Sequence, residues 1–178
     1  MLNLFFIFNY SLRLISLDVG LLKIMTNQFT VVEQFKIKQA EIKDAERIAI
    51  LCDEQLGFTV TNQQIEQRLA KIKNNNSHIV YVATLANEYV IGWAHAHISD
   101  LIVRQTSAII WGLVVDKDYR HSGIGRCLMQ QIEQWAFLAG CENVLLTSNI
   151  KRKEAHLFYE KIGYTNIKQS FTFHKKLI

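Results

Sequence analysis

A glycine-containing loop between an apolar strand and an amphipathic helix is the feature of this sequence that points most directly to chemistry. The loop is Arg120-His121-Ser122-Gly123-Ile124-Gly125, and the apolar run Leu113-Val114-Val115 precedes it. Glycines let backbone N–H groups approach phosphate oxygens, and the start of a helix adds partial positive charge. The spacing lacks the GK[ST] ending of a nucleotide-triphosphatase loop and the G-x-G-x-x-G of a dinucleotide site. The loop indicates a phosphate-binding turn, and a simple tight strand-to-helix turn is the alternative.

Three ring side chains alternate along another predicted strand, and two of them could handle protons. Trp93, His95 and His97 are separated by alanines, so all three face the same side of the strand. Histidine titrates near neutral pH, which suits proton removal. His95 and His97 are therefore candidates for a general base, and the alternative is a pair of partly buried rings that only shape a pocket. Glu54, near the end of the first predicted helix, is a further option.

Hydrophobic periodicity predicts the elements that position these residues. Apolar residues spaced three and four apart indicate a helix over 42–56 that ends at Gly57, and Thr61 with Gln64 forms a capping-box signature for a second helix. Alternating or continuous apolar runs predict strands, and the tail could supply one or two more. The result is a mixed sheet with helices packed on it. The remaining predicted elements are strands at 35–38, 78–86, 89–98, 108–115 and 144–146, helices at 124–138 and 155–162, and the tail strands within 164–177.

Two separate segments carry a resemblance to a known family. Residues 112–126, Gly-Leu-Val-Val-Asp-Lys-Asp-Tyr-Arg-His-Ser-Gly-Ile-Gly-Arg, closely resemble the acetyl-CoA-binding core of the GCN5-related N-acetyltransferase (GNAT) family. Residues 155–164 resemble that family's second signature, and Asn149 just upstream fits as well. The resemblance covers roughly residues 35–178. It implies an α/β fold of the α+β type, the GNAT fold, with a mixed, mostly antiparallel central sheet of about six to seven strands flanked by helices.

The resemblance implies an N-acetyltransferase that moves an acetyl group from acetyl-CoA to a primary amine, by direct transfer in a ternary complex. Acetyl-CoA is then the co-substrate, no metal is expected, and the acceptor is a small-molecule or peptide amine. Many relatives place a glutamate on the strand before the loop, whereas this chain has Ala108-Ile109-Ile110-Trp111 there. This departure leaves the base undecided and keeps open a non-catalytic acyl-CoA-binding regulatory module. A third reading is an enzyme that acetylates aminoacyl-tRNA.

The same resemblance implies roles for individual residues. Tyr159 matches the general acid that protonates the departing CoA thiolate, and a phenol with a pKa of about 10 can donate to a thiolate; the alternative is a helix residue that merely turns its ring inward. Gly112 would mark a bulge that opens a cleft. The basic turn at 151–153 would recognise the ribose 3′-phosphate of CoA, or would simply be solvated. The implied cofactor-binding residues are Leu113, Val114, Val115, Arg120, His121, Ser122, Gly123, Ile124, Gly125, Arg126, Asn149, Arg152 and Tyr159.

Composition and charge narrow the class of protein. A chain of 178 residues, 49% apolar and 20% charged, fits one folded globular domain. The formal charge of +4 suits a phosphate-bearing ligand but is too weak and scattered to indicate a nucleic-acid partner. Cys52, Cys127 and Cys141 lack metal-ligand spacing and indicate reduced thiols of a cytoplasmic protein. A homodimer is left open.

The first 24 residues differ in composition from the rest and predict a separate extension before an N-acetyltransferase domain at 35–178. They are strongly apolar, but they lack the basic start and the cleavage site of a secretory signal. Arg13 and Asp18 interrupt the run too early for a spanning helix, so no membrane partner is expected. A peripheral membrane anchor, an extra packing segment and a start codon assigned too far upstream remain. We favour the last, because Met25-Thr26-Asn27 would begin the chain just before the first strand.

Overall fold

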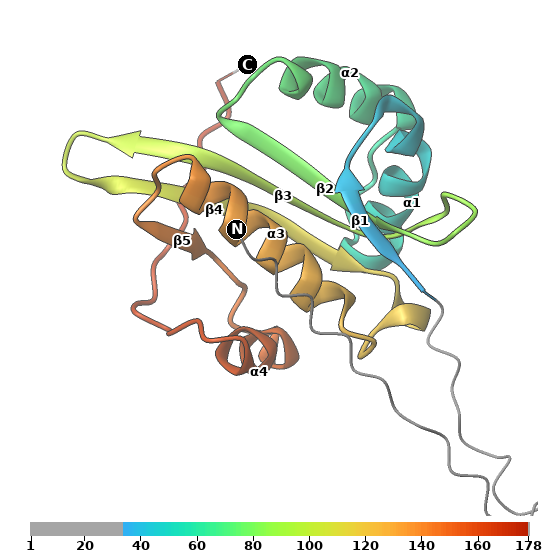
Figure 1. The fold of residues 1–178 in the computed structure, drawn as a ribbon. Coiled ribbons are helices and arrows are strands. Elements are labelled where there is room, and N and C mark those ends of the chain that lie inside the picture. Colours follow the sequence, from blue (N-terminus) through green and yellow to red (C-terminus); the bar gives the residue numbers. More distant parts are fainter. Residues whose placement is uncertain (1–33, 178) are drawn as a thin grey trace, which may run out of the picture. The chain divides into compact units, whose positions relative to one another are not determined.

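The computed structural model describes residues 34–177, and the extension predicted at residues 1–24 lies outside the described residues. The described residues contain a five-stranded sheet with the strand order β1-β2-β3-β4-β5 (Figure 1). All neighbouring strands pair antiparallel except β4 and β5, which are parallel. This is the predicted mixed, mostly antiparallel sheet. The strands are β1 (Lys36–Gln39), β2 (His78–Thr84), β3 (Val90–Leu101), β4 (Arg104–Val115) and β5 (Asn143–Leu146).

Helices cover both faces of the sheet. α1 (Ala45–Leu56) and α2 (Asn62–Lys73) lie on one face, and α3 (Ile124–Leu138) lies on the other (Figure 1). α4 (Lys153–Lys161) follows β5, and two 3-10 helices, η1 (Ile42–Asp44) and η2 (Lys117–Tyr119), precede α1 and α3. The predicted order of elements is confirmed from β1 to α4. None of the helices in residues 34–177 has both the length and the apolar content to cross a bilayer.

Local signals place the ends of α1 and α2 where the sequence predicts them. Gly57 has a φ of 69°, a left-handed conformation that ends α1. Thr61 Oγ1 accepts a hydrogen bond from the Gln64 amide (3.2 Å), and the Gln64 side chain accepts one from the Thr61 amide (3.0 Å). This reciprocal capping box confirms the predicted start of α2. Because only a short segment links the two helices, both pack on the same face of the sheet.

The sheet separates two buried apolar clusters, and their burial is the main force that holds the helices in place. The cluster under α1 and α2 includes Leu51, Leu69, Val82, Val90 and Val114. The cluster under α3 includes Ile91, Ile110, Leu128, Met129 and Ile132. Leu138, an apolar residue at the end of the helix predicted at 124–138, is the last residue of α3 and is 77% exposed.

The sheet has fewer strands than the predicted six to seven. Residues 164–177 contain no strand, so five strands remain in the described residues. The alternation of this tail suggested a strand, yet Ile167, Phe171 and Phe173 are 73%, 91% and 92% exposed. A strand is stabilised by backbone hydrogen bonds to a neighbour and by burial of one face. Within residues 34–177 the tail has neither.

Candidate active site

The two parallel strands β4 and β5 pair over a short distance and then part. Pairing runs from Ser107 opposite Asn143 to Ile110 opposite Leu146, where β5 ends. β4 continues to Val115, and in the described sheet its remaining neighbour is β3. The other edge of the backbone at 111–115 is therefore open. An extended ligand can hydrogen-bond to such an edge as another strand would.

A β-bulge lies where β4 leaves β5. His95 pairs with Gly112 and Ala96 pairs with Ile110, so Trp111 is the extra residue. A Cβ added to Gly112 would lie 2.4 Å from Cζ3 of Trp93, which is closer than real Cβ contacts come. Gly112 is thus required by the Trp93 ring. The predicted bulge is present, with Trp111 rather than Gly112 as the extra residue, and the Trp111 side chain is 64% exposed.

The predicted phosphate loop leads into the N-terminus of α3. The first intrahelical hydrogen bond of α3 runs from the Cys127 amide to the Gly123 carbonyl (3.1 Å). The amides of residues 124–126 come before it and have no acceptor within the helix. His121 (φ 63°) and Gly123 (φ 88°) are left-handed and turn the chain tightly beneath these amides. Free amides at a positively polarised helix end are a geometry that binds anions.

Side chains fix this loop to the rest of the domain. Arg120 donates through Nη2 to Oε1 of Gln55 on α1 (2.6 Å) and through Nε to the Val115 carbonyl (3.3 Å). The Ser122 hydroxyl donates to the Tyr119 carbonyl. Arg47 of α1 forms an ion pair with the buried Asp116 at the end of β4. The Arg120 guanidinium therefore holds the loop against α1, and its contribution to a ligand site is to position the amides.

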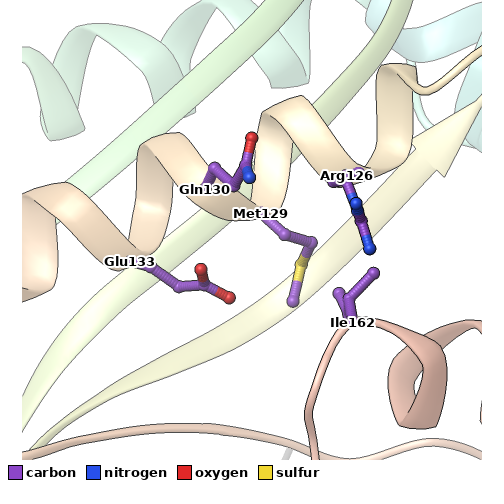
Figure 2. Close-up of a pocket in the computed structure, with 5 residues that line it drawn as sticks. All are labelled: Arg126, Met129, Gln130, Glu133 and Ile162. Atoms are coloured by element: carbon purple, nitrogen blue, oxygen red, sulfur yellow. The ribbon is translucent and has the colours of Figure 1, made fainter.

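The Arg126 side chain extends toward the C-terminal end of α4. Figure 2 shows it extending from α3 toward Ile162, just after α4. There it lines a small cavity of about 230 Å³ together with Met129, Gln130 and Glu133. Its backbone amide belongs to the first turn of α3. Arg126, which was predicted to bind the cofactor, therefore contributes only its backbone amide to the phosphate loop.

Tyr159 lies on α4 and packs toward α3. Its ring contacts those of Phe158 (centroids 5.3 Å apart) and Tyr164 (6.1 Å), both in edge-to-face geometry. A Cβ added to Gly125 would lie 3.2 Å from Cζ of Phe158, so this glycine lets α4 approach the start of α3. Burial raises the pKa of the Tyr159 phenol, and the charge of Arg152 opposes this. The phenol therefore carries its proton at neutral pH and can donate it.

Asn149 and Arg152 lie on the segment that continues from the end of β5 to α4. The Asn149 side chain accepts a hydrogen bond from the Lys151 amide (2.9 Å). The backbone carbonyl oxygen of Asn149 lies 3.1 Å from Nε2 of His156. Arg152 is the N-cap of α4 and is exposed. These contacts show Asn149 shaping the turn, while the Arg152 guanidinium remains accessible to an anionic ligand.

The two predicted histidines share a cluster with a third histidine that the sequence prediction did not include. His78 on β2 has its Nδ1 3.3 Å from Nε2 of His95. Its ring also stacks on that of His97, with centroids 5.4 Å apart. Trp111 donates from Nε1 to Nδ1 of His97 (2.6 Å). The cluster therefore runs across β2, β3 and β4 and reaches the bulge.

Burial favours the neutral forms of His95 and His97. It is the largest cause that lowers the pKa of His95, to about 4, and the charges of His78 and His97 lower it further. The pKa of His97 is lowered by burial and then by His78. Among the described residues no carboxylate forms an ion pair with any of the three rings. In the same residues no group of three or more His, Cys, Asp or Glu side chains is arranged to hold a metal ion.

A protein-family model matches most of the described part of the chain. Residues 44–164 match the model described as the acetyltransferase (GNAT) family. The matched segment runs from the start of α1 to just beyond α4. It therefore contains the histidine cluster, the open edge of β4, the phosphate loop and Tyr159.

Individual relatives extend this likeness. The chain is 31% identical over 157 residues to the aminoalkylphosphonate N-acetyltransferase of Salmonella typhimurium, covering 86% of this chain and 99% of that protein. It is 28% identical over 113 residues to an aminoglycoside N(6′)-acetyltransferase type 1 of Acinetobacter genomosp. 13, covering 62% and 70%. A solved aminoglycoside N-acetyltransferase in complex with CoA superposes with a TM-score of 0.71 at 16% identity, covering 80% and 95%, and shows the same fold.

Proposed function

The chain belongs to the acetyltransferase (GNAT) family and is an acyltransferase, and we propose that it transfers the acetyl group of acetyl-CoA to the primary amine of a small molecule. One observation carries the proposal. The open backbone edge at 111–115 starts at the bulge, where His95 pairs with Gly112, and the chain continues from this edge through the phosphate loop to the free amides at the start of α3. One extended thioester with a phosphate tail can use all of these features together.

The residues of the site fit acetyl-CoA. The backbone of Leu113 and the amide of Val115 lie on the open edge and suit the two amides of the pantetheine arm, whereas the Val115 carbonyl already accepts from Nε of Arg120. Val114 points into the core beneath α1. The amides of residues 124–126 suit the pyrophosphate, and nothing lies within 4 Å of a Cβ added to Gly123, so that approach is clear. The exposed guanidinium of Arg152 suits the 3′-phosphate.

Two side chains would move the protons of the reaction. The neutral amine attacks the thioester carbonyl, a C–N bond forms and the C–S bond breaks. His95, neutral at pH 7 because its pKa is lowered to about 4, accepts the proton that leaves the nitrogen. Tyr159, with its raised pKa, donates a proton to the departing thiolate. His97 is less suited, because its Nδ1 already accepts the indole N–H of Trp111.

We expect the best acceptors to be small amines whose other groups are neutral or anionic. In the described residues no carboxylate forms an ion pair with the rings of the histidine cluster, and proteins usually bind polycations through carboxylates. The aminoalkylphosphonate N-acetyltransferase is also similar to this chain over most of both lengths. The measurement is release of free CoA thiol from acetyl-CoA over a panel of 2-aminoethylphosphonate, amino acids, polyamines, aminoglycosides and peptides, with N-acetyl products identified by mass spectrometry.

The expected result is amine-dependent thiol release that is fastest with 2-aminoethylphosphonate or an amino acid. Faster turnover of an aminoglycoside would contradict the expected acceptor class but not the transferase. Acetyl-CoA binding without thiol release over the whole panel would support the regulatory module instead.

A further inference from the structure

Each of the three neutral imidazole rings of the histidine cluster has one nitrogen lone pair, and these lone pairs differ in their hydrogen-bond partners. A neutral imidazole has one N–H and one lone pair. The indole N–H of Trp111 can only donate, so the lone pair of His97 on Nδ1 is already used. The contact between Nδ1 of His78 and Nε2 of His95 holds a single proton, which can belong to either ring. The position of this proton decides which ring nitrogen of the cluster has a lone pair that can accept a proton from a substrate.

Tautomer preference favours one direction for this hydrogen bond. If Nε2–H of His95 donates to Nδ1 of His78, both rings are Nε2–H tautomers, the form that a neutral histidine side chain prefers in water. The opposite direction requires the less favoured Nδ1–H tautomer in both rings. His97 is also an Nε2–H tautomer, because its Nδ1 accepts from Trp111. In this arrangement His95 is the only ring of the cluster whose lone pair has no hydrogen-bond partner among the described residues.

We propose that His78 is a positioning residue for His95, in which Nδ1 of His78 accepts the Nε2–H of His95 and leaves the His95 lone pair on Nδ1 to receive the proton of the acceptor amine. The inference rests on the proposed function. His95 pairs with Gly112 at the bulge, whereas His78 lies on β2, with β3 between it and β4. His78 therefore acts through His95 and not on the substrate.

The contact also changes the energy of proton uptake. When the amine N–H bond breaks and the Nδ1–H bond of His95 forms, His95 becomes an imidazolium. Its Nε2–H then makes a charge-assisted hydrogen bond to His78, which is stronger than the neutral bond it replaces. The proton later leaves to solvent, and no oxidant or other reactant is needed. The titratable groups that act on His95 in the described residues are His78 and His97, and neither supplies a negative charge that could do this instead.

Imidazole nitrogen NMR tests the tautomer without any substrate. Two variants form a matched pair. His78→Asn places an amide oxygen at the same bond distance from Cα as Nδ1 and can still accept, whereas His78→Leu cannot. The wild type and His78→Asn are expected to show His95 protonated at Nε2, and His78→Leu is expected to show a mixture of tautomers. The same Nε2–H tautomer in His78→Leu, or an Nδ1–H tautomer of His95 in the wild type, would overturn the proposal.

Kinetics with the best amine of the panel test the consequence for catalysis. We expect His78→Leu to lower kcat about ten- to a hundredfold, the range that a hydrogen bond to a charged group contributes, while His78→Asn keeps most of the activity. An unchanged melting shift with acetyl-CoA shows that both variants are folded. Equal activity of the two variants would overturn the proposal, as would loss of wild-type activity on adding a chelator, which would indicate a metal between the rings. If no amine is acetylated, the proposed function fails while the NMR result still decides the tautomer.

Discussion

Replacing Tyr159 with phenylalanine is expected to lower the turnover rate about a hundredfold or more while leaving acetyl-CoA affinity almost unchanged. The phenylalanine ring keeps the edge-to-face contacts with Phe158 and Tyr164. The substitution therefore removes the hydroxyl and little else. Because burial raises the pKa of Tyr159, the wild-type phenol holds a proton throughout the neutral range and loses donor function only at high pH. Steady-state kinetics with a saturating amine measures the effect.

Tyr164→Phe is the matched control. Tyr164 lies in the same aromatic group, and its hydroxyl donates to Oε1 of Glu133 (2.8 Å). Its pKa is raised by burial and by the Glu133 carboxylate. Losing this hydroxyl should cost stability, about 1 kcal/mol for one hydrogen bond, but little turnover. Full activity in Tyr159→Phe would remove the acid role from this residue. Equal loss in both variants would mean that the aromatic group is needed only for packing.

Gly123→Asp is expected to abolish the rise in melting temperature that acetyl-CoA produces. A ligand at a hundred times its Kd stabilises a fold by about 2.7 kcal/mol, so the wild-type shift should be several degrees. Gly123 immediately precedes α3, with open space around its Cβ position. An aspartate there would set a negative charge against the pyrophosphate and cancel the favourable field of the helix end.

Gly123→Asn separates charge from backbone strain. Gly123 has a φ of 88°, which penalises most side chains, and asparagine tolerates the left-handed region better than other residues. Asparagine has nearly the size of aspartate but no charge, so this variant should retain most of the shift. A normal response in Gly123→Asp would show that the phosphate loop is assigned wrongly. Equal loss in both variants would show that backbone strain, and not charge, is responsible.

Features with a local cause could be predicted from the sequence. Gly57 and the pair Thr61 and Gln64 determine the ends of α1 and α2 through contacts within a few residues. The alternation of Trp93 with His95 and His97 reflects the two faces of β3. The family resemblance identified the two motifs, and the structure brings them into contact where Phe158 of α4 packs against Gly125 at the start of α3.

Features that depend on distant partners could not be predicted. The tail alternates like a strand, but only a neighbouring strand could make it one, and in residues 34–177 it has none. Arg126 belongs to the loop motif, yet its side chain follows the packing of α4. His78 was not predicted as a site residue, because its role depends on the register between β2 and β3. The strands predicted at 78–86 and 89–98 contained this signal, because residues equally distant from the short gap between them include His78 and His97, which do pair.

A crystal structure of this protein with CoA tests the central claim most directly. The account predicts the pantetheine amides hydrogen-bonded to the backbone of Leu113 and Val115 on the open edge of β4. It predicts the pyrophosphate on the amides of residues 124–126, and the sulfur between Tyr159 and His95. CoA bound with its pyrophosphate away from the start of α3, or with its sulfur remote from both side chains, would contradict the account.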